Sequence, residues 1–419
     1  MPPSLFDMRS HTALYTSLLA SALASSVQPP FPPPSPLKPW LYFGANGTGP
    51  VDSMPSLSLA SRGGLGGYGW QNFGASTNFS HGGEAHLLGA AAALAAYAPA
   101  LPVFVYRHFQ MAWRLFDVQR PIIDDPKYRT LLLHDNDNAP AAKECLQGVP
   151  GNGTSPLLVF EAPSPAGQWW VDRVVGEVAA EPSIKAVFFD ETDWSYCGYN
   201  FTRATGCSNL SAAFLARDYA AKLPALRATA DALAAAGKWP IFSSKNLREE
   251  AWQGLPAKAT RPCVVPGNAY AAALEGATWG RFYEFWMGQG ATYDAATIAN
   301  VLLEGAAGVG LIARAPADAA AQCPGDTSSC DAPAKTELSY ALAAFLIART
   351  SPYSYFGVSS GWYSQCWCWH AEYDAVAACG APTAPPIRTS PFSWTRAYEH
   401  CTVSVNTTAQ KGAVLAKRA

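Results

Sequence analysis

The sequence carries little charge and no concentration of positive charge. Only 14% of its 419 residues are charged, the formal net charge is −2, and lysine and arginine form no cluster. A protein that binds a phosphate backbone needs a basic stripe on its surface. The composition therefore argues against a nucleic-acid partner.

Motifs for cofactors and metals are also scarce. The chain has no P-loop, and its glycine-rich segment Arg62–Gly69 is not read as a nucleotide site. The seven histidines form no His-x-x-x-His or Glu-x-x-His pair, and His134–Asn138 (HDNDN) lacks the glycine and closing glutamate of a calcium loop. We predict no cofactor and no metal, which disfavours a metal-dependent hydrolase.

Long apolar runs that could cross a membrane are missing, with one apparent exception. The stretch Leu87–Tyr106 has no charge, but it is mostly alanine and is interrupted by Pro99 and Pro102. Alanine contributes little transfer free energy, and the prolines divide the run into a helix followed by a strand. We predict no membrane span.

The N-terminus and the cysteine and asparagine patterns indicate the secretory pathway. Arg9 precedes the mostly apolar stretch Thr12–Ala24, which ends in a small-x-small form, so residues 1–24 are predicted to be a signal peptide. The ten cysteines are even in number without paired CxxC spacing, which favours disulfides over zinc. Six Asn-x-Ser/Thr sequons begin at Asn46, Asn78, Asn152, Asn200, Asn209 and Asn406. We expect a secreted or luminal glycoprotein.

Two local disulfides would close the shortest loops. We predict the pairs Cys197–Cys207 and Cys323–Cys330 because each closes a short loop. The sequence does not pair the other six cysteines, which are Cys145, Cys263, Cys366, Cys368, Cys379 and Cys401.

From Trp40 onward, short apolar runs alternate with Ala/Leu-rich helical patterns, whereas residues 25–39 are proline-rich and predict a linker. Strands are predicted at Leu41–Gly44, Leu65–Trp70, Val103–Arg107, Ala186–Asp190, Pro240–Ser243, Thr278–Glu284, Val309–Ala313 and Ser354–Gly357. Helices are predicted at Glu84–Ala98, Trp170–Ala180, Leu210–Ala236, Ala295–Ala307 and Lys335–Ala348. This alternation predicts a (β/α)8 TIM barrel over residues 40–361.

One alternative fold stays open at this point. The segment between Arg107 and Ala186 is too long for one helix, and Leu157–Phe160 could be a further strand, which would fit an open doubly wound sheet. Residues 362–419, rich in Trp, Cys and Pro, predict a short disulfide-bonded β-rich extension with a hairpin turn near Thr407–Gly412.

Two predicted strands, AVFFD and TWGRFYE, end in a carboxylate, Asp190 and Glu284. The C-terminal ends of barrel strands face the active site, and if both acids point inward then Phe188 and Phe282 do as well. Such a pair can cleave a glycosidic bond, because one carboxyl protonates the leaving oxygen while the other attacks carbon or activates water. Apolar neighbours favour a protonated Glu284, so it is predicted as general acid and Asp190 as nucleophile or base. The alternative for Glu284 is a buried ion pair, with Arg281 as its only local basic neighbour.

The acids that follow Asp190 have other uses as well. An acid just after a strand often caps the next helix. Glu191 is the alternative catalytic residue, and Asp193 is expected to be a cap or to support another residue of the site.

Aromatic residues make up 12% of the chain, including 14 Trp, which suits a sugar-binding protein but also a large aromatic core. Residues near strand ends could bond sugar hydroxyls or an acidic sugar substituent, or stack on pyranose faces. The candidates are Arg107, His108, Lys245, Asn246, Trp70, Trp194, Trp279 and Trp286. The alternatives are an ion pair for Arg107 and a core position for each tryptophan.

Four stretches, VFFDE, YEF, NVLLEGAAGVG and SPYSYFGVSSGW, resemble the glycoside-hydrolase-like (β/α)8-barrel proteins of marine and algal genomes. The likeness extends over most of the chain from about Trp40. The strand positions of the acids also resemble the clan of α-galactosidases and α-glucosidases. That resemblance implies a nucleophile on the fourth strand and an acid/base residue on the sixth, which match Asp190 and Glu284. That clan normally has Asp where this chain has Glu284.

We therefore predict a secreted, monomeric glycoside hydrolase that acts on a poly- or oligosaccharide. The alternative is a non-catalytic carbohydrate-binding protein of the cell surface or extracellular space, built on the same barrel.

Overall fold

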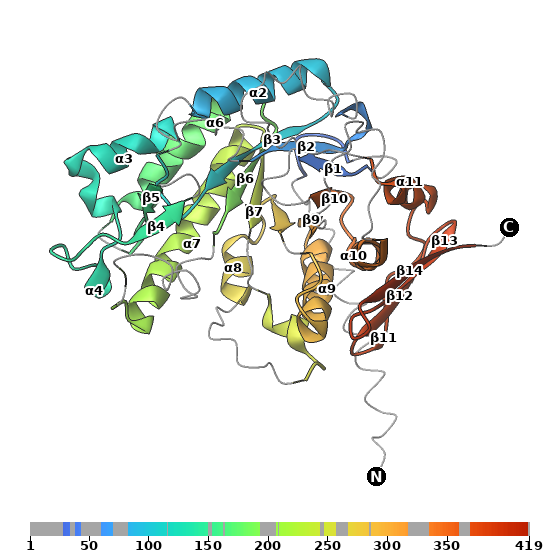
Figure 1. Ribbon diagram of the computed structural model, residues 1–419. Helices are drawn as coiled ribbons and strands as arrows, with labels where there is room; N and C mark the ends of the chain where they lie inside the picture. Colours follow the sequence, from blue (N-terminus) through green and yellow to red (C-terminus); the bar gives the residue numbers. More distant parts are fainter. Residues whose placement is uncertain are drawn as a thin grey trace, which may run out of the picture.

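The computed structural model describes residues 28–33, 38–42, 60–69, 83–114, 116–149, 153–161, 164–192, 207, 209–243, 247–256, 267–284, 286–316, 335–359 and 369–417, and every structural statement refers to these residues. Figure 1 shows a curled sheet surrounded by helices, with a smaller sheet beside it. None of the described helices is long and apolar enough to cross a membrane.

The central sheet is a barrel of eight parallel strands. They are β1 (Trp40–Tyr42), β2 (Leu65–Tyr68), β3 (Val103–His108), β6 (Ala186–Asp190), β7 (Trp239–Ser243), β8 (Gly280–Tyr283), β9 (Gly310–Pro316) and β10 (Ser354–Ser359). They pair in the order in which the chain reaches them, and β1 approaches β10, so that the barrel is nearly closed. The predicted (β/α)8 fold is confirmed, with Asp190 at the end of the fourth barrel strand and Glu284 directly after the sixth.

Helices lie on the outside of this barrel, and most of them follow the predicted ranges. They are α2 (Gly83–Tyr97), α5 (Ala166–Trp169) continuing through a π-helical turn (Trp170–Val175) into α6 (Gly176–Ala180), α7 (Ala212–Ala235), α8 (Gly267–Ala273), α9 (Ala291–Ala306) and α10 (Lys335–Ala348). The run read as a membrane-like stretch is indeed a helix, α2, followed by a strand, β3.

The long segment between β3 and β6 is an excursion from the barrel. It contains α3 (Arg120–Asp124), α4 (Asp135–Asn138) and a hairpin of β4 (Leu146–Val149) with β5 (Gly153–Pro156). Leu157 and Leu158, the candidate extra strand, form only isolated antiparallel bridges within the excursion. The alternative of an open doubly wound sheet was therefore wrong, and the strand numbering of the two carboxylates holds.

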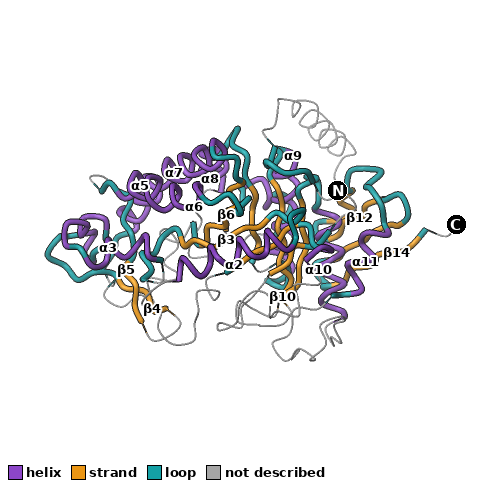
Figure 2. Tube along the Cα trace, turned by 90° about the horizontal axis from the view of Figure 1, so that it is seen from above, coloured by secondary structure: helices purple, strands orange, loops and turns teal. Residues whose placement is uncertain are grey.

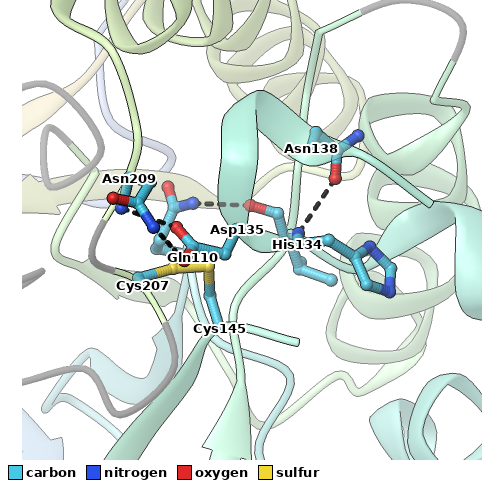
Figure 3. Close-up of a disulfide and its surroundings, with 8 residues drawn as sticks. Gln110, His134, Asp135, Asn138, Cys145, Cys207 and Asn209 are labelled. Carbon is cyan, nitrogen blue, oxygen red and sulfur yellow. Dashed lines mark hydrogen bonds between the residues drawn. A yellow bond between two sulfur atoms is a disulfide. The ribbon is translucent and has the colours of Figure 1, made fainter. Parts of the chain in front are cut away.

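A disulfide ties this excursion to the chain that follows β6 (Figure 3). Cys207 bonds Cys145, with a Cα–Cα distance of 5.1 Å and a sequence separation of 62. Asp135 reinforces the link, since its carboxylate accepts from the backbone and side-chain amides of Asn209 at 2.8 and 3.3 Å. The predicted pair Cys197–Cys207 was wrong, because the fold brings the excursion against the start of α7.

The four described cysteines all lie in disulfides, the second being Cys379–Cys401. Cys323 and Cys330, like Cys197, lie outside the described residues.

Aromatic rings fill the inside of the barrel. The ring centroids of Phe188 and Phe282 are 4.4 Å apart, and Trp40 lies 5.4 Å from Phe282. At the N-terminal end, Trp239 lies so close to the backbone of Gly280 that a Cβ there would come within 2.4 Å of it. Glycine is therefore required beside this ring.

Phe31 completes the N-terminal end of the barrel. It is 9% exposed, and its ring lies 5.8 Å from Trp239 and 6.2 Å from Tyr353. The prediction that residues 25–39 form only a linker was wrong for this residue, because a single aromatic side chain can join a core although its proline-rich neighbours cannot build one.

A four-stranded antiparallel sheet forms the C-terminal extension. Its strands are β11 (Ile387–Ser390), β12 (Ser393–Ala397), β13 (Cys401–Asn406) and β14 (Lys411–Ala416), and it follows α11 (Ala371–Ala378). The hairpin turn between β13 and β14 confirms the prediction. The sheet lies against α10, where the Tyr398 hydroxyl donates to Leu346 O at 2.6 Å, at the opposite end of the molecule from β4 and β5 (Figure 2).

Candidate active site

Asp190 lies at the C-terminal end of β6 and is 9% exposed. It is two residues beyond Phe188, which faces the barrel interior, so strand alternation directs its carboxylate into the barrel. One carboxylate oxygen, Oδ2, accepts from the Tyr106 hydroxyl at 2.9 Å, and the other, Oδ1, accepts from the Glu191 backbone N–H at 2.9 Å. These two donors fix the orientation of the carboxylate.

The turn after Asp190 is held in an unusual conformation. Glu191 has φ = 55°, in the left-handed region that non-glycine residues rarely adopt. Thr192 anchors the turn, because its hydroxyl donates to Ser243 O at the end of β7 and lies 2.9 Å from the Tyr270 hydroxyl. A strained residue held by its surroundings is a feature of functional sites.

Glu284 follows β8 and lies beside Arg314 of β9. Its Oε1 is 3.5 Å from Arg314 Nη1, with the two side chains 17% and 6% exposed. The same Nη1 donates to Glu284 O at 3.3 Å. The apolar setting predicted for Glu284 was wrong on this side, because Arg314 of the neighbouring strand pairs with it, as the alternative of a buried ion pair predicted.

The turn after Glu284 is left-handed as well. Met287, Gly288 and Gly290 have φ values of 66°, 83° and 100°. Asp294, buried at the start of α9, accepts from the backbone N–H groups of Gly288 and Gln289 at 2.9 and 3.0 Å. It also accepts from the Tyr340 hydroxyl at 2.8 Å. The segment that carries Glu284 is thereby tied to α9 and α10.

Tyr106 lies beside Asp190 and donates to its carboxylate. It is 2% exposed, and burial raises the pKa of its hydroxyl well above the usual value, with further increases from the charges of Asp190, Glu191 and Glu284. Asp190 ends β6, Glu191 follows it, and Glu284 directly follows β8. The structure thus brings both predicted catalytic residues and their alternative, Glu191, to the C-terminal end of the barrel.

His108 is the last residue of β3 and the register partner of Asp190. Burial, followed by the positive charge of Lys222, lowers its pKa to about 3. Its Nδ1 accepts from the Met111 backbone N–H at 3.1 Å. The imidazole is therefore neutral near pH 7, with its proton on Nε2.

Arg107 points the other way. Its guanidinium is fully buried and lies 2.7 Å from Glu84 Oε1 and 3.3 Å from Glu177 Oε2, between β3 and the helices α2 and α6. Its predicted role in binding sugar was wrong, and the alternative of an ion pair is the one that the structure shows.

Two of the predicted stacking residues are core residues. Trp279 is 3% exposed and lies against Phe242 and Tyr270, at 6.1 and 5.9 Å between ring centroids. Trp286 is fully buried and donates to Ala341 O at 2.8 Å. Their predicted stacking on sugar was wrong, because both rings serve to attach helices to the barrel.

Several predicted residues lie outside the described part of the chain. These are Trp70, Asp193, Trp194, Lys245 and Asn246, and the sequon asparagines Asn46, Asn78, Asn152 and Asn200. Among the residues that are described, no three His, Cys, Asp or Glu side chains come together as a metal site requires.

Tyr106 and Arg314 were not predicted as site residues. A signal for Tyr106 was available, because it lies two residues before His108 and so shares its face of the strand. Arg314 lies one residue beyond the predicted strand Val309–Ala313. It comes two residues after Ile312, which pairs with Phe282, so alternation along β9 places both on the inner face.

The sequence matches the family described as hypothetical glycosyl hydrolase family 15 over residues 96–402, more than half of the chain and including both carboxylates. No curated protein matches it significantly.

Among solved structures, isomaltulose synthase from Klebsiella sp. LX3 is similar at 10% identity, with 89% of this chain and 90% of that chain covered and a TM-score of 0.49. The glucosidase II alpha subunit is 13% identical over 83% of this chain and 34% of its own, with a TM-score of 0.45. A family GH13_31 enzyme is 10% identical over 60% and 59%, with a TM-score of 0.34, so the chain spans less than two thirds of these last two proteins. By its match over residues 96–402, the chain belongs to hypothetical glycosyl hydrolase family 15, which places it among the glycosidases.

Proposed function

We propose that the protein hydrolyses a glycosidic bond in a poly- or oligosaccharide, with Asp190 as nucleophile or base and Glu284 as general acid. The observation that carries this proposal is the placement of Asp190 at the end of β6 and of Glu284 directly after β8, at the C-terminal end of the barrel, where barrel enzymes bind their substrates.

Each group has a proposed task. The two hydrogen bonds to Asp190 stabilise its ionised form and aim it at a sugar above the barrel. Glu284, on the side of the barrel next to β9, gives its proton to the leaving oxygen as the bond breaks. Neutral His108, the register partner of Asp190, ends the neighbouring strand and is proposed to help bind the sugar.

The test needs a substrate first, so a screen of algal and plant polysaccharides and aryl glycosides precedes the variants. Asp190→Asn and Glu284→Gln should each lower kcat by about 10²-fold or more with little change in thermal stability. Asp231→Asn and Glu275→Gln make the same changes at exposed positions and should leave kcat unchanged. Full activity of Asp190→Asn on the best substrate would rule out its role and turn attention to Glu191.

The same variants distinguish the proposed hydrolase from the alternative function, carbohydrate binding without catalysis. A non-catalytic carbohydrate-binding protein would show no turnover of any sugar in the screen. In that case Asp190→Asn and Glu284→Gln would bind the best ligand with unchanged affinity.

The protein is further proposed to be a secreted, monomeric glycoprotein. The predicted signal peptide and the sequons support export, and the two described sequon asparagines, Asn209 and Asn406, are both exposed. Enzymatic removal of N-glycans from natively expressed protein should lower its mass, and Asn406→Gln should remove one glycan. An unchanged mass would contradict export through the secretory pathway.

A further inference from the structure

We propose that Tyr106 is the positioning residue of the reaction: its hydroxyl holds Asp190 ionised and in a single orientation. The proposal rests on the proposed function, since it gives Tyr106 a task only if Asp190 is the nucleophile or base.

The contact follows from the register of two neighbouring strands. Tyr106 on β3 is the partner of Phe188 on β6, one step below Asp190 on the same face. A tyrosine side chain is long enough to span this diagonal, and its hydroxyl donates to Asp190 Oδ2 at 2.9 Å. A phenylalanine here would fill the same space without reaching the carboxylate.

The ring of Tyr106 cannot turn away from this position. Its centroid lies 5.6 Å from Phe188 below, and 6.4 Å from both Trp113 and Phe116 in the loop after β3. All three neighbours are buried. A donor that is fixed before substrate binds costs little ordering entropy when the reaction occurs.

Tyr106 remains a proton donor throughout the working range of a glycosidase. Burial and the surrounding carboxylates raise its pKa well above the usual value, so the hydroxyl stays neutral and is not itself a nucleophile. A neutral donor lowers the energy of an ionised Asp190 relative to the protonated form. Glu191 N–H contributes the same on the other oxygen but cannot be removed by mutation.

Tyr106→Phe is the test, with Tyr355→Phe as the matched control. Tyr355 is also a fully buried tyrosine of the barrel interior, and its hydroxyl has no hydrogen-bond partner among the described residues. Loss of a hydrogen bond to a charged group should lower kcat/KM of Tyr106→Phe by about 10- to 100-fold. The acidic limb of its pH–rate profile should move to higher pH, because Asp190 then takes up a proton more readily. Tyr355→Phe should leave the rate and both limbs in place.

A second variant should shift the acidic limb of the pH–rate profile in the opposite direction. This test does not depend on how well Tyr106→Phe folds. Site-specific replacement of Tyr106 by 3-fluorotyrosine keeps the shape and makes the hydroxyl a stronger donor, so the acidic limb should move to lower pH. A residue that merely fills space would produce no such reversal.

The outcomes separate this proposal from the proposed function. If Asp190→Asn abolishes turnover while both Tyr106 variants keep the wild-type acidic limb, the function stands and the role of Tyr106 is wrong. If Asp190→Asn is fully active, the proposed function fails and this inference fails with it.

Discussion

Asp190 and Glu284 occupy equivalent places on β6 and β8, but the molecule holds them by different means. Asp190 accepts hydrogen bonds from two neutral donors, Tyr106 and a backbone N–H, whereas Glu284 lies beside the charged Arg314. The two carboxyls of a glycosidase have different tasks, one as general acid and the other as nucleophile or base. Two acids of nearly the same intrinsic strength can take different roles only if their surroundings differ.

The two strand ends share their backbone design. Each carboxylate precedes a turn with a left-handed non-glycine residue, Glu191 or Met287. A hydrogen bond to a neighbouring element anchors each turn. Thr192 binds Ser243 O at the end of β7, and Gly288 N–H donates to Asp294 of α9. The anchors differ in kind again: a hydroxyl near Asp190, and a buried carboxylate near Glu284. The variants below test whether these differences matter.

The largest effect is expected at Asp294. Asp294→Asn keeps the shape but replaces one acceptor oxygen with an amino group, which leaves a buried donor of the turn unsatisfied. The free energy of unfolding should fall by about 2–4 kcal/mol in a urea titration. The kcat of the folded enzyme should also fall, because Glu284 loses its fixed position. An unchanged kcat would show that the turn supports the fold and not the site.

Arg314→Met should lower the activity at the Glu284 end. Arg314 Nη1 lies 3.5 Å from Glu284 Oε1 and donates to Glu284 O, so its loss frees the Glu284 side chain, and kcat/KM should fall about tenfold. Arg281→Met is the control, since Arg281 lies on the outer face of β8 and pairs with Glu304. It should lower stability and leave kcat/KM of the folded enzyme unchanged. An unchanged kcat/KM in Arg314→Met would contradict a role of this contact in the site.

Thr192→Val should have a smaller effect, at the Asp190 end. It removes one hydroxyl that contacts Ser243 O and Tyr270, at a cost of about 1–2 kcal/mol in unfolding free energy. The kcat should fall by more than the loss of folded protein explains, because the turn positions the Glu191 N–H that donates to Asp190. Thr229→Val, which removes a buried hydroxyl inside α7, is the comparison and should not alter kcat.

The sequence was sufficient to predict the barrel and the C-terminal end of β6. Continuous apolar runs such as AVFF are what a parallel strand buried on both faces requires, and β6 has the predicted bounds. Alternation along β6 then placed Asp190 on the face of Phe188. These inferences succeeded because they depend only on neighbours in the chain.

Partners that are distant in the chain could not be predicted. Arg107 and Arg314 both interrupt apolar strands, yet one faces helices and the other faces Glu284. Which face of a strand looks inward depends on the register of its neighbours, and this is set by the whole barrel. The Cys145–Cys207 bond is similar, since local loop closure favours a near partner and the fold supplies a distant one.

The smallest effect is expected at Glu177 of α6, which lies beside Arg107 on the outer face of β3. Its titration affects how the pH–rate profiles are interpreted. Burial, with help from the neighbouring Glu84, raises the pKa of Glu177 to about 8 from its ordinary 4.5, although Arg107 opposes this. Between these two values the folded protein keeps a proton that the unfolded chain has lost. Stability should therefore fall as the pH rises through this window and level off above pH 8.

Glu177→Gln should remove that slope and leave the rate profile alone. Melting temperatures measured every half unit from about pH 4 to 9 should be flatter for the variant than for the wild type, with the difference reduced because the Glu177 side chain is 31% exposed. The acidic limb assigned to Asp190 should stay where it is, since Glu177 faces away from the barrel interior. If the acidic or basic limb moved with Glu177→Gln, the limbs would report on stability, and the comparison between the two strand ends would need a pH-independent measurement.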